Sequence, residues 1–139
     1  MRFQTPKQDF ILRNLCDGKR WQLICPLVWR SMDSTTIHVP AGFITDFAST
    51  PWFVWWFLPK TGLYDRAAVI HDWLYINQRI TIAGARVPVS RIQCDLWFAE
   101  AAEDCESSDF NCACLYAGVR AGGWLAWNRN RKASYASKL

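Results

Sequence analysis

One apolar run, "AAVIHDWLY" at residues 67–75, constrains the fold more than any other part of the chain. His71 and Asp72 stand side by side in it, among alanine, valine, isoleucine, leucine and tryptophan. Burying an unpaired charge costs several kcal/mol. Each of the two groups therefore needs a partner inside the protein or a chemical role.

The composition predicts one globular domain over residues 1–127, followed by a basic tail over residues 128–139. The chain has 139 residues, of which 51% are hydrophobic and nine are tryptophan, so it can bury a core and is not disordered. The net charge of +4 lies in the tail, which has no acid and four basic residues: Arg129, Arg131, Lys132 and Lys138. We expect the tail to be solvated, with weak phosphate contacts at most, and predict no other nucleic-acid binding.

The sequence predicts a soluble protein made in the cytoplasm. The longest aromatic-apolar run, residues 52–58, is far shorter than the roughly 20 residues that span a bilayer. Lys7 and Asp9 stand where a signal peptide would have its apolar core. The six cysteines form no zinc-binding pattern, and without a signal peptide we expect mostly free, buried thiols.

The fold class indicated is α+β, with antiparallel strands over about residues 9–47. The runs "QDFILRNL" and "KRWQLICPLVW" are joined through "CDGK", and Asp-Gly is a strong hairpin signal. A third extended run, "TTIHVPAGFITDF", contains Pro40, which suits an edge or a bulge.

Helices are predicted for the rest of the chain. Thr50 and Pro51 suit the start of a short tryptophan-rich helix that ends at Pro59. Three longer helices follow, each with a capping residue at its start: from Asp65 to about Asn77, from Ser90 to about Cys105, and from Ser108 or Asp109 to about Trp127. The polar linker between the first two longer helices is a loop or a small hairpin.

Two of these helices place a histidine and two carboxylates where they can act together. His71 and Tyr75 share a helix face, and Asp95 lies on the apolar face of the next helix. If the helices pack antiparallel, Asp95 can fix the tautomer of His71, whose other nitrogen can take a proton from water. Asp72, on the neighbouring edge, can hold a cation. Alternatively, His71 is a satisfied core residue and each aspartate caps a backbone group.

The pair "AAVIHDWLY" and "CDLWFAEAA" resembles the catalytic helix pair of phospholipase A2, over about residues 64–105. The resemblance implies that His71 activates water and that Asp95 orients it. It also implies that Asp72 helps to bind calcium and that Tyr75 is a supporting hydrogen-bond donor.

The whole chain is similar to a family of small bacteriophage and prophage proteins of unknown function. Three motifs carry this likeness in order: "VPAGFITDFASTP", "AAVIHDWLY" and "SRIQCDLWFAEA". The family implies a phage genome and an α+β fold. It also draws attention to Asp46 and Ser49, which precede a helix start. Asp46 either caps that helix or joins His71 and Asp72 as a ligand of zinc, manganese or calcium.

The segment "PWFVWWFL" has three possible interpretations. Trp52, Trp55 and Trp56 could form a foot on a membrane interface, a docking patch for virion proteins, or plain core.

The leading functional hypothesis is a phage-encoded hydrolase that uses a His71–Asp95 dyad on an ester, with lipid as the first candidate substrate and calcium or zinc as a candidate metal. The second is a non-catalytic virion or tail component, made in the host cytoplasm and carried in the virion. The third is a metal-dependent enzyme that acts on cell-wall or nucleic-acid bonds.

Overall fold

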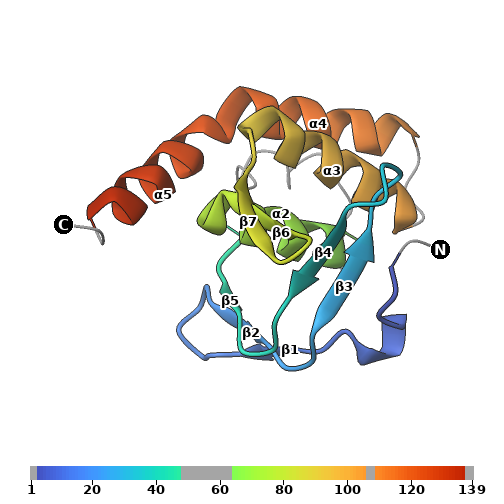
Figure 1. Ribbon diagram of the computed structural model, residues 1–139. Helices are drawn as coiled ribbons and strands as arrows, with labels where there is room; N and C mark the ends of the chain where they lie inside the picture. Colours follow the sequence, from blue (N-terminus) through green and yellow to red (C-terminus); the bar gives the residue numbers. More distant parts are fainter. Residues whose placement is uncertain (1–2, 48–63, 106–108, 137–139) are drawn as a thin grey trace.

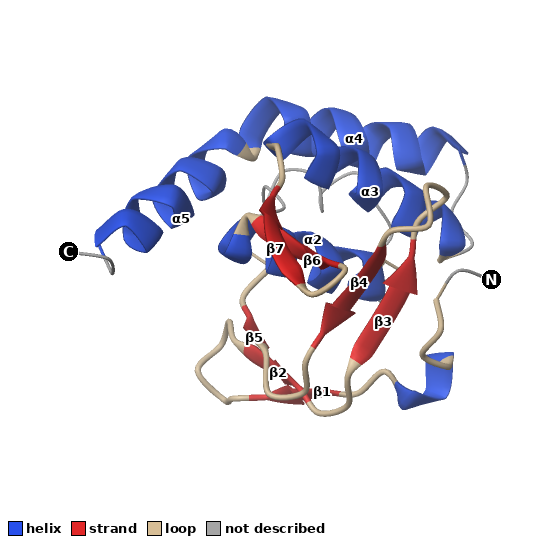
Figure 2. Ribbon diagram, viewed as in Figure 1, coloured by secondary structure: helices blue, strands red, loops and turns tan. Residues whose placement is uncertain are grey.

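The computed structural model describes residues 3–47, 64–105 and 109–136. Short antiparallel strands occupy the N-terminal part of the chain, and helices occupy most of the rest (Figures 1 and 2). The predicted α+β class is therefore confirmed. The predicted tryptophan-rich helix, together with Ser49, Trp52, Trp55 and Trp56, lies outside the described residues.

The N-terminal strands form two small antiparallel sheets. The first has the order β1-β2-β5, and the second pairs β3 with β4. A short 3-10 turn, η1, precedes them. The bounds are Lys7–Asp9 for η1, Leu12–Asn14 for β1, Trp21–Leu23 for β2, Leu27–Arg30 for β3, Thr36–Val39 for β4 and Ile44–Thr45 for β5.

The Asp-Gly signal is confirmed as the connection between β1 and β2. Gly18 has a φ of +84°, which a residue with a Cβ rarely adopts. The side chain of Asp17 accepts hydrogen bonds from the backbone N–H groups of Lys19 and Arg20, which holds the turn.

Two runs that were expected to be single extended segments are each divided into two strands. The run that contains β2 and β3 is interrupted before Leu27, where Pro26 has no N–H to donate to a sheet ladder. The run that contains β4 and β5 turns after Pro40, and Gly42 has a φ of +92° there. Pro40 thus lies in a turn between two sheets and not at a bulge within one strand.

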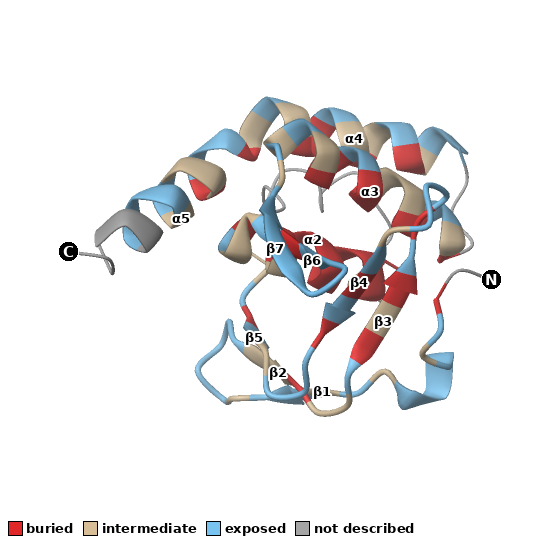
Figure 3. Cartoon of the chain, viewed as in Figure 1, coloured by how far each residue is buried: buried red, intermediate tan, exposed pale blue. Residues whose placement is uncertain are grey.

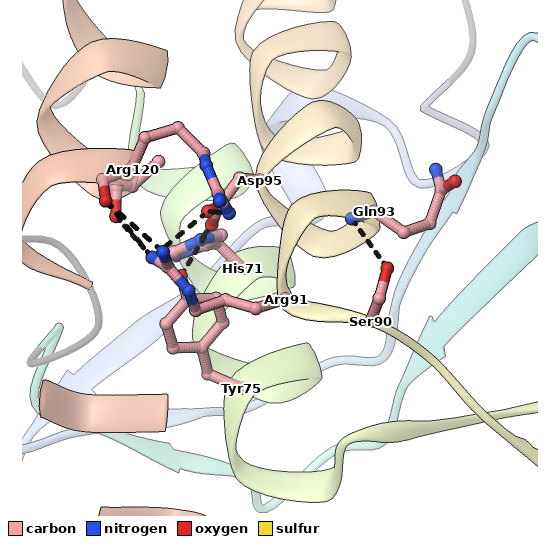
Figure 4. A network of polar contacts seen from close by, with 8 residues as sticks. His71, Tyr75, Ser90, Arg91, Gln93, Asp95 and Arg120 are labelled. Carbon is pink, nitrogen blue, oxygen red and sulfur yellow. Dashed lines mark hydrogen bonds and ion pairs between the residues drawn. The ribbon is translucent and has the colours of Figure 1, made fainter. Parts of the chain in front are cut away.

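Four helices follow in the described parts of the chain: α2 (Asp65–Asn77), α3 (Arg91–Asp104), α4 (Asp109–Gly122) and α5 (Trp124–Ala136). Ser90 caps α3 as predicted, because its side chain accepts a hydrogen bond from the backbone N–H of Gln93 (Figure 4). Asp65 is not a cap. It is the first residue of α2, and Tyr64 occupies the cap position without a side-chain hydrogen bond.

The last predicted helix was wrong in its extent, because it is two helices. Helix α4 ends at Gly122 and α5 begins at Trp124. Helix α5 continues to Ala136, past the predicted end at Trp127. Much of the expected basic tail is therefore helical. Figure 1 shows α5 extending away from the body of the molecule.

The linker after α2 is the small hairpin that the sequence allowed. Strands β6 (Arg79–Ile82) and β7 (Ala85–Pro88) pair antiparallel around Gly84. Gln78 ends α2 in the left-handed conformation, with its N–H bonded to the carbonyl of Leu74. The hairpin is largely exposed (Figure 3).

The core surrounds α2. Nine residues of this helix are buried, on all sides of it, because the sheets and the other helices pack around it (Figure 3). Trp29 of β3 is fully buried and donates from its indole nitrogen to Asp104 of α3 at 2.7 Å, which fastens the second sheet to the helices. No described helix is long and apolar enough to cross a membrane.

All six cysteines are free thiols, as expected, and their burial predicts two reactivity classes. Cys94, Cys105 and Cys112 are buried, and burial raises the pKa of Cys94 to about 12. We expect a thiol reagent to count six thiols in denatured protein and to leave these three largely unreacted in native protein. Fewer than six thiols after denaturation without a reductant would contradict the free-thiol assignment.

Candidate active site

Helices α2 and α3 pack against each other in opposite directions. Tyr75, near the end of α2, lies beside Asp95, near the start of α3. At the other end of the pair, the backbone of Ala67 lies beside the thiol of Cys105. The antiparallel arrangement on which the predicted dyad depended is therefore present.

The expected contact between His71 and Asp95 is formed. His71 Nε2 lies 2.8 Å from Asp95 Oδ1, within hydrogen-bond reach. Because an ionised carboxylate only accepts, Nε2 donates, and a neutral ring then carries its lone pair at Nδ1. Both side chains are 0% exposed. The ring of His71 packs against those of Tyr75 and Phe98, with centroids 4.2 and 4.5 Å away.

Asp95 is the centre of a larger network (Figure 4). Its Oδ1 also accepts a hydrogen bond of 2.6 Å from the hydroxyl of Tyr75. Its Oδ2 accepts one of 2.9 Å from Arg120 Nη1, and Arg91 Nη1 is 3.6 Å away. Four side chains from three helices thus converge on one buried carboxylate, as a buried charge requires.

Arg91 also holds the end of α4. Its guanidinium donates to the backbone carbonyls of Val119 and Arg120, at 3.1 to 3.4 Å. These carbonyls belong to the last turn of α4, where a cation is favourable to the helix dipole. Arg91 therefore fixes the turn that carries Arg120 to Asp95.

The environment of Asp95 shifts its acidity. Burial alone would raise the pKa of this carboxyl, but hydrogen bonds from His71, Tyr75 and Arg120 outweigh burial and lower it. The pKa of Tyr75 is raised, first by burial and then by the neighbouring Asp95. Asp95 is therefore ionised and Tyr75 is a hydroxyl donor at neutral pH.

The lowered pKa of Asp95 predicts a pH dependence of stability. A carboxyl with a lower pKa in the folded state stabilises the fold above its unfolded value, about 3.9, and loses that contribution as the pH falls through the folded pKa. We expect the free energy of unfolding to fall more steeply with acid in the native protein than in Asp95→Asn. Denaturant titrations at several pH values below neutral measure this, and parallel curves for the two proteins would contradict it.

Asp72 occupies a different environment from Asp95. It is buried and accepts a hydrogen bond of 2.7 Å from Thr45 Oγ1 of β5, so it ties α2 to the first sheet. Asp46, the next residue after Thr45, is exposed. In the part of the chain that the structure describes, no three histidine, cysteine or acidic side chains gather as a metal site. Binding of a metal by His71, Asp72 and Asp46 stays a prediction.

Four residues in and around the network were not identified from the sequence. Arg120 and Thr45 are far along the chain from their partners, and no local pattern marks them. Arg91 stands four residues before Asp95, a spacing that favours an ion pair on one helix face and so was a usable signal. Gly123 follows Gly122 directly, and a Gly-Gly pair is a turn signal that could have identified it.

Gly123 leaves room for Tyr75. A Cβ at this position would lie 2.5 Å from the carbonyl oxygen of Val119 and 2.6 Å from the Tyr75 hydroxyl. We expect Gly123→Ala to lower the free energy of unfolding by about 1–3 kcal/mol, because backbone and ring must both move. Chemical denaturation measures the loss, and Ala121→Gly, at an exposed position of α4, is the comparison variant. An unchanged stability in Gly123→Ala would contradict the close approach.

These features define a small α+β protein in which a central helix pair encloses a charged histidine–aspartate network. A family model described as "Protein of unknown function (DUF1353)" matches residues 21–119, and the chain belongs to this family. No curated protein and no solved structure matches the chain. The predicted membership of a family of unknown function is confirmed, and the phage origin stays a prediction.

Proposed function

We propose that the protein is a hydrolase in which His71 removes a proton from water and Asp95 orients His71. The contact of 2.8 Å between His71 Nε2 and Asp95 Oδ1 carries the proposal. It fixes the ring so that Nδ1 is the nitrogen that can accept the proton. The same contact, with Tyr75 as a second donor to Asp95, agrees with what the resemblance to phospholipase A2 implies. An ester is the proposed substrate, with lipid first among esters.

A reaction at His71 has three steps that the chain's own groups would perform. Nδ1 takes a proton from water while the water oxygen attacks the carbonyl carbon of the ester. The imidazolium that forms keeps its Nε2–H bonded to Asp95, whose negative charge stabilises it. The ring then returns the proton to the alcohol oxygen as the carbon–oxygen bond breaks, so His71 and Asp95 end as they began.

A second candidate, a non-catalytic virion or tail component, is favoured by a different observation. His71 and Asp95 are both 0% exposed, and Asp95 already has four partners. In this candidate the role of the network is purely structural: it fixes the packing of three helices. The two candidates differ in what His71 does, so one variant separates them.

The test is hydrolysis of phospholipid vesicles and of a simple chromogenic ester, each with calcium, with zinc and with a chelator. We expect the native protein to release hydrolysis products from these substrates. We expect the same of the Glu103→Gln variant, which is changed at an exposed position of α3. We expect none from His71→Asn, provided that its circular dichroism shows a native fold. Dependence on calcium or zinc would support the metal-dependent form of the proposal. No release under any of these conditions, together with a large loss of stability in His71→Asn, would overturn it in favour of the structural role.

A further inference from the structure

A cleft lined in part by the β6–β7 hairpin lies outside the histidine–aspartate network. It has a volume of about 490 Å³, within the range of small-molecule sites. Strand β4, the end of α2 and the hairpin form its walls, and these elements lie together in Figure 1. Its polar lining comes from Thr36, His38, Asn77, Arg79, Thr81 and Arg86.

The charges at this cleft are of one sign. Arg79 and Arg86 line it, and none of the described acidic residues does. Within the described ranges, neither arginine forms an ion pair or a side-chain hydrogen bond. Asp33, in the neighbouring hollow, is engaged by Ser31 and Thr35. Among the residues that the structure describes, two exposed guanidinium groups are thus left without a counter-charge.

The strand register brings these arginines together. Arg79 pairs with Pro88 and Thr81 pairs with Arg86, so Arg79 and Arg86 are diagonal neighbours on one face of the hairpin. Such neighbours have Cα atoms about 7–8 Å apart, within reach of long side chains. Like charges at this spacing repel each other, and an anion between them would relieve the repulsion.

The other walls suit an organic phosphate. Thr81 stands beside Arg86 on the same face, and its hydroxyl can donate to an oxyanion. Trp73 of α2 is half-buried, and its ring packs edge-on against Phe43 at 5.2 Å, which holds it in place as an apolar wall. Arginine presents paired N–H donors that match phosphate oxygens.

We propose that this cleft binds the phosphate group of a small organic phosphate, through Arg79 and Arg86. The organic part lies toward Trp73. The site is separate from the proposed hydrolase chemistry and does not depend on it.

Calorimetric titration of the full chain with adenosine monophosphate, inorganic phosphate and adenosine tests the proposal. We expect saturable binding of the monophosphate, weaker binding of inorganic phosphate and none of adenosine. Arg86→Gln should weaken monophosphate binding roughly 10- to 100-fold, the range for loss of a charged hydrogen bond. Arg79→Gln should do the same, and Arg13→Gln, an exposed change on β1, should leave binding unchanged.

Three results would overturn the proposal. The first is no saturable binding of the monophosphate or of phosphate at millimolar concentration. The second is equal binding by the native protein and by the Arg79→Gln/Arg86→Gln double variant, with both folded by circular dichroism. The third is adenosine binding as tight as that of the monophosphate, because the phosphate would then contribute nothing.

Discussion

Replacing Asp95 with alanine is expected to lower the free energy of unfolding by about 3–5 kcal/mol, the range for removing one partner of a buried ion pair. The change leaves the hydroxyl of Tyr75 and the Nε2–H of His71 without their acceptor, in surroundings that exclude water. It also leaves Arg120 and Arg91 without the carboxylate that offsets their charge. Urea titration monitored by circular dichroism measures the loss.

The matched control for that experiment is Glu103→Ala. Glu103 is also an acid on α3, but it is exposed, so its removal should change the free energy of unfolding by less than about 0.5 kcal/mol. Equal effects of the two substitutions would show that the four contacts to Asp95 contribute nothing to the fold. A large effect of Asp95→Ala alone agrees with both candidate functions, so it tests the network and not the catalysis.

The second large effect concerns rate. If the hydrolase proposal holds, Asp95→Asn should lower kcat by about 10⁴-fold, as the corresponding substitution does in a Ser-His-Asp triad. The amide group can donate to His71 Nε2, which favours the tautomer with its hydrogen on Nδ1, and that nitrogen can then no longer take a proton from water. KM should change little, because the Asp95 side chain is 0% exposed and is occupied by contacts within the protein.

Steady-state kinetics of ester hydrolysis measure that effect, at a temperature where the variant is folded by circular dichroism. Glu103→Gln is the comparison, with both constants expected to be those of the native protein. A loss of less than tenfold in kcat for folded Asp95→Asn would contradict an orienting role for this carboxylate.

Local periodicity was enough to predict the centre of the site. The spacing of four between His71 and Tyr75 puts them on one face of a helix, and the apolar residues around Asp95 put it on the inner face of the next. The two helices are joined through a hairpin, and their antiparallel packing brings the three groups together. The structure has this arrangement, with contacts of 2.8 and 2.6 Å to Asp95.

The contacts that complete the site are long-range, and local pattern does not encode them. Arg120 reaches Asp95 because α4 packs against α3 and Arg91 holds the end of α4. Thr45 reaches Asp72 only because β5 joins the first sheet beside α2. The sequence therefore predicted which carboxylates would be buried, but not that one would bind arginine and the other a threonine hydroxyl.

The errors in the fold have local causes that were visible in the sequence. Pro26 and the Pro40–Gly42 turn divide the extended runs, because proline cannot donate to a ladder and glycine permits the turn. The Gly-Gly pair before Trp124 falls inside the single helix that was predicted to run to about Trp127. It marks the end of that helix instead.

The tautomer of His71 is the most direct test of the central claim that Asp95 orients this ring for proton removal at Nδ1. Long-range proton–nitrogen NMR spectra distinguish the two neutral tautomers, and the chain has only one other histidine, His38, to assign. We predict the tautomer with its hydrogen on Nε2 in the native protein, and its loss in Asp95→Asn. A neutral ring with its hydrogen on Nδ1 in the native protein would contradict the claim, because Nε2 could not then donate to Asp95.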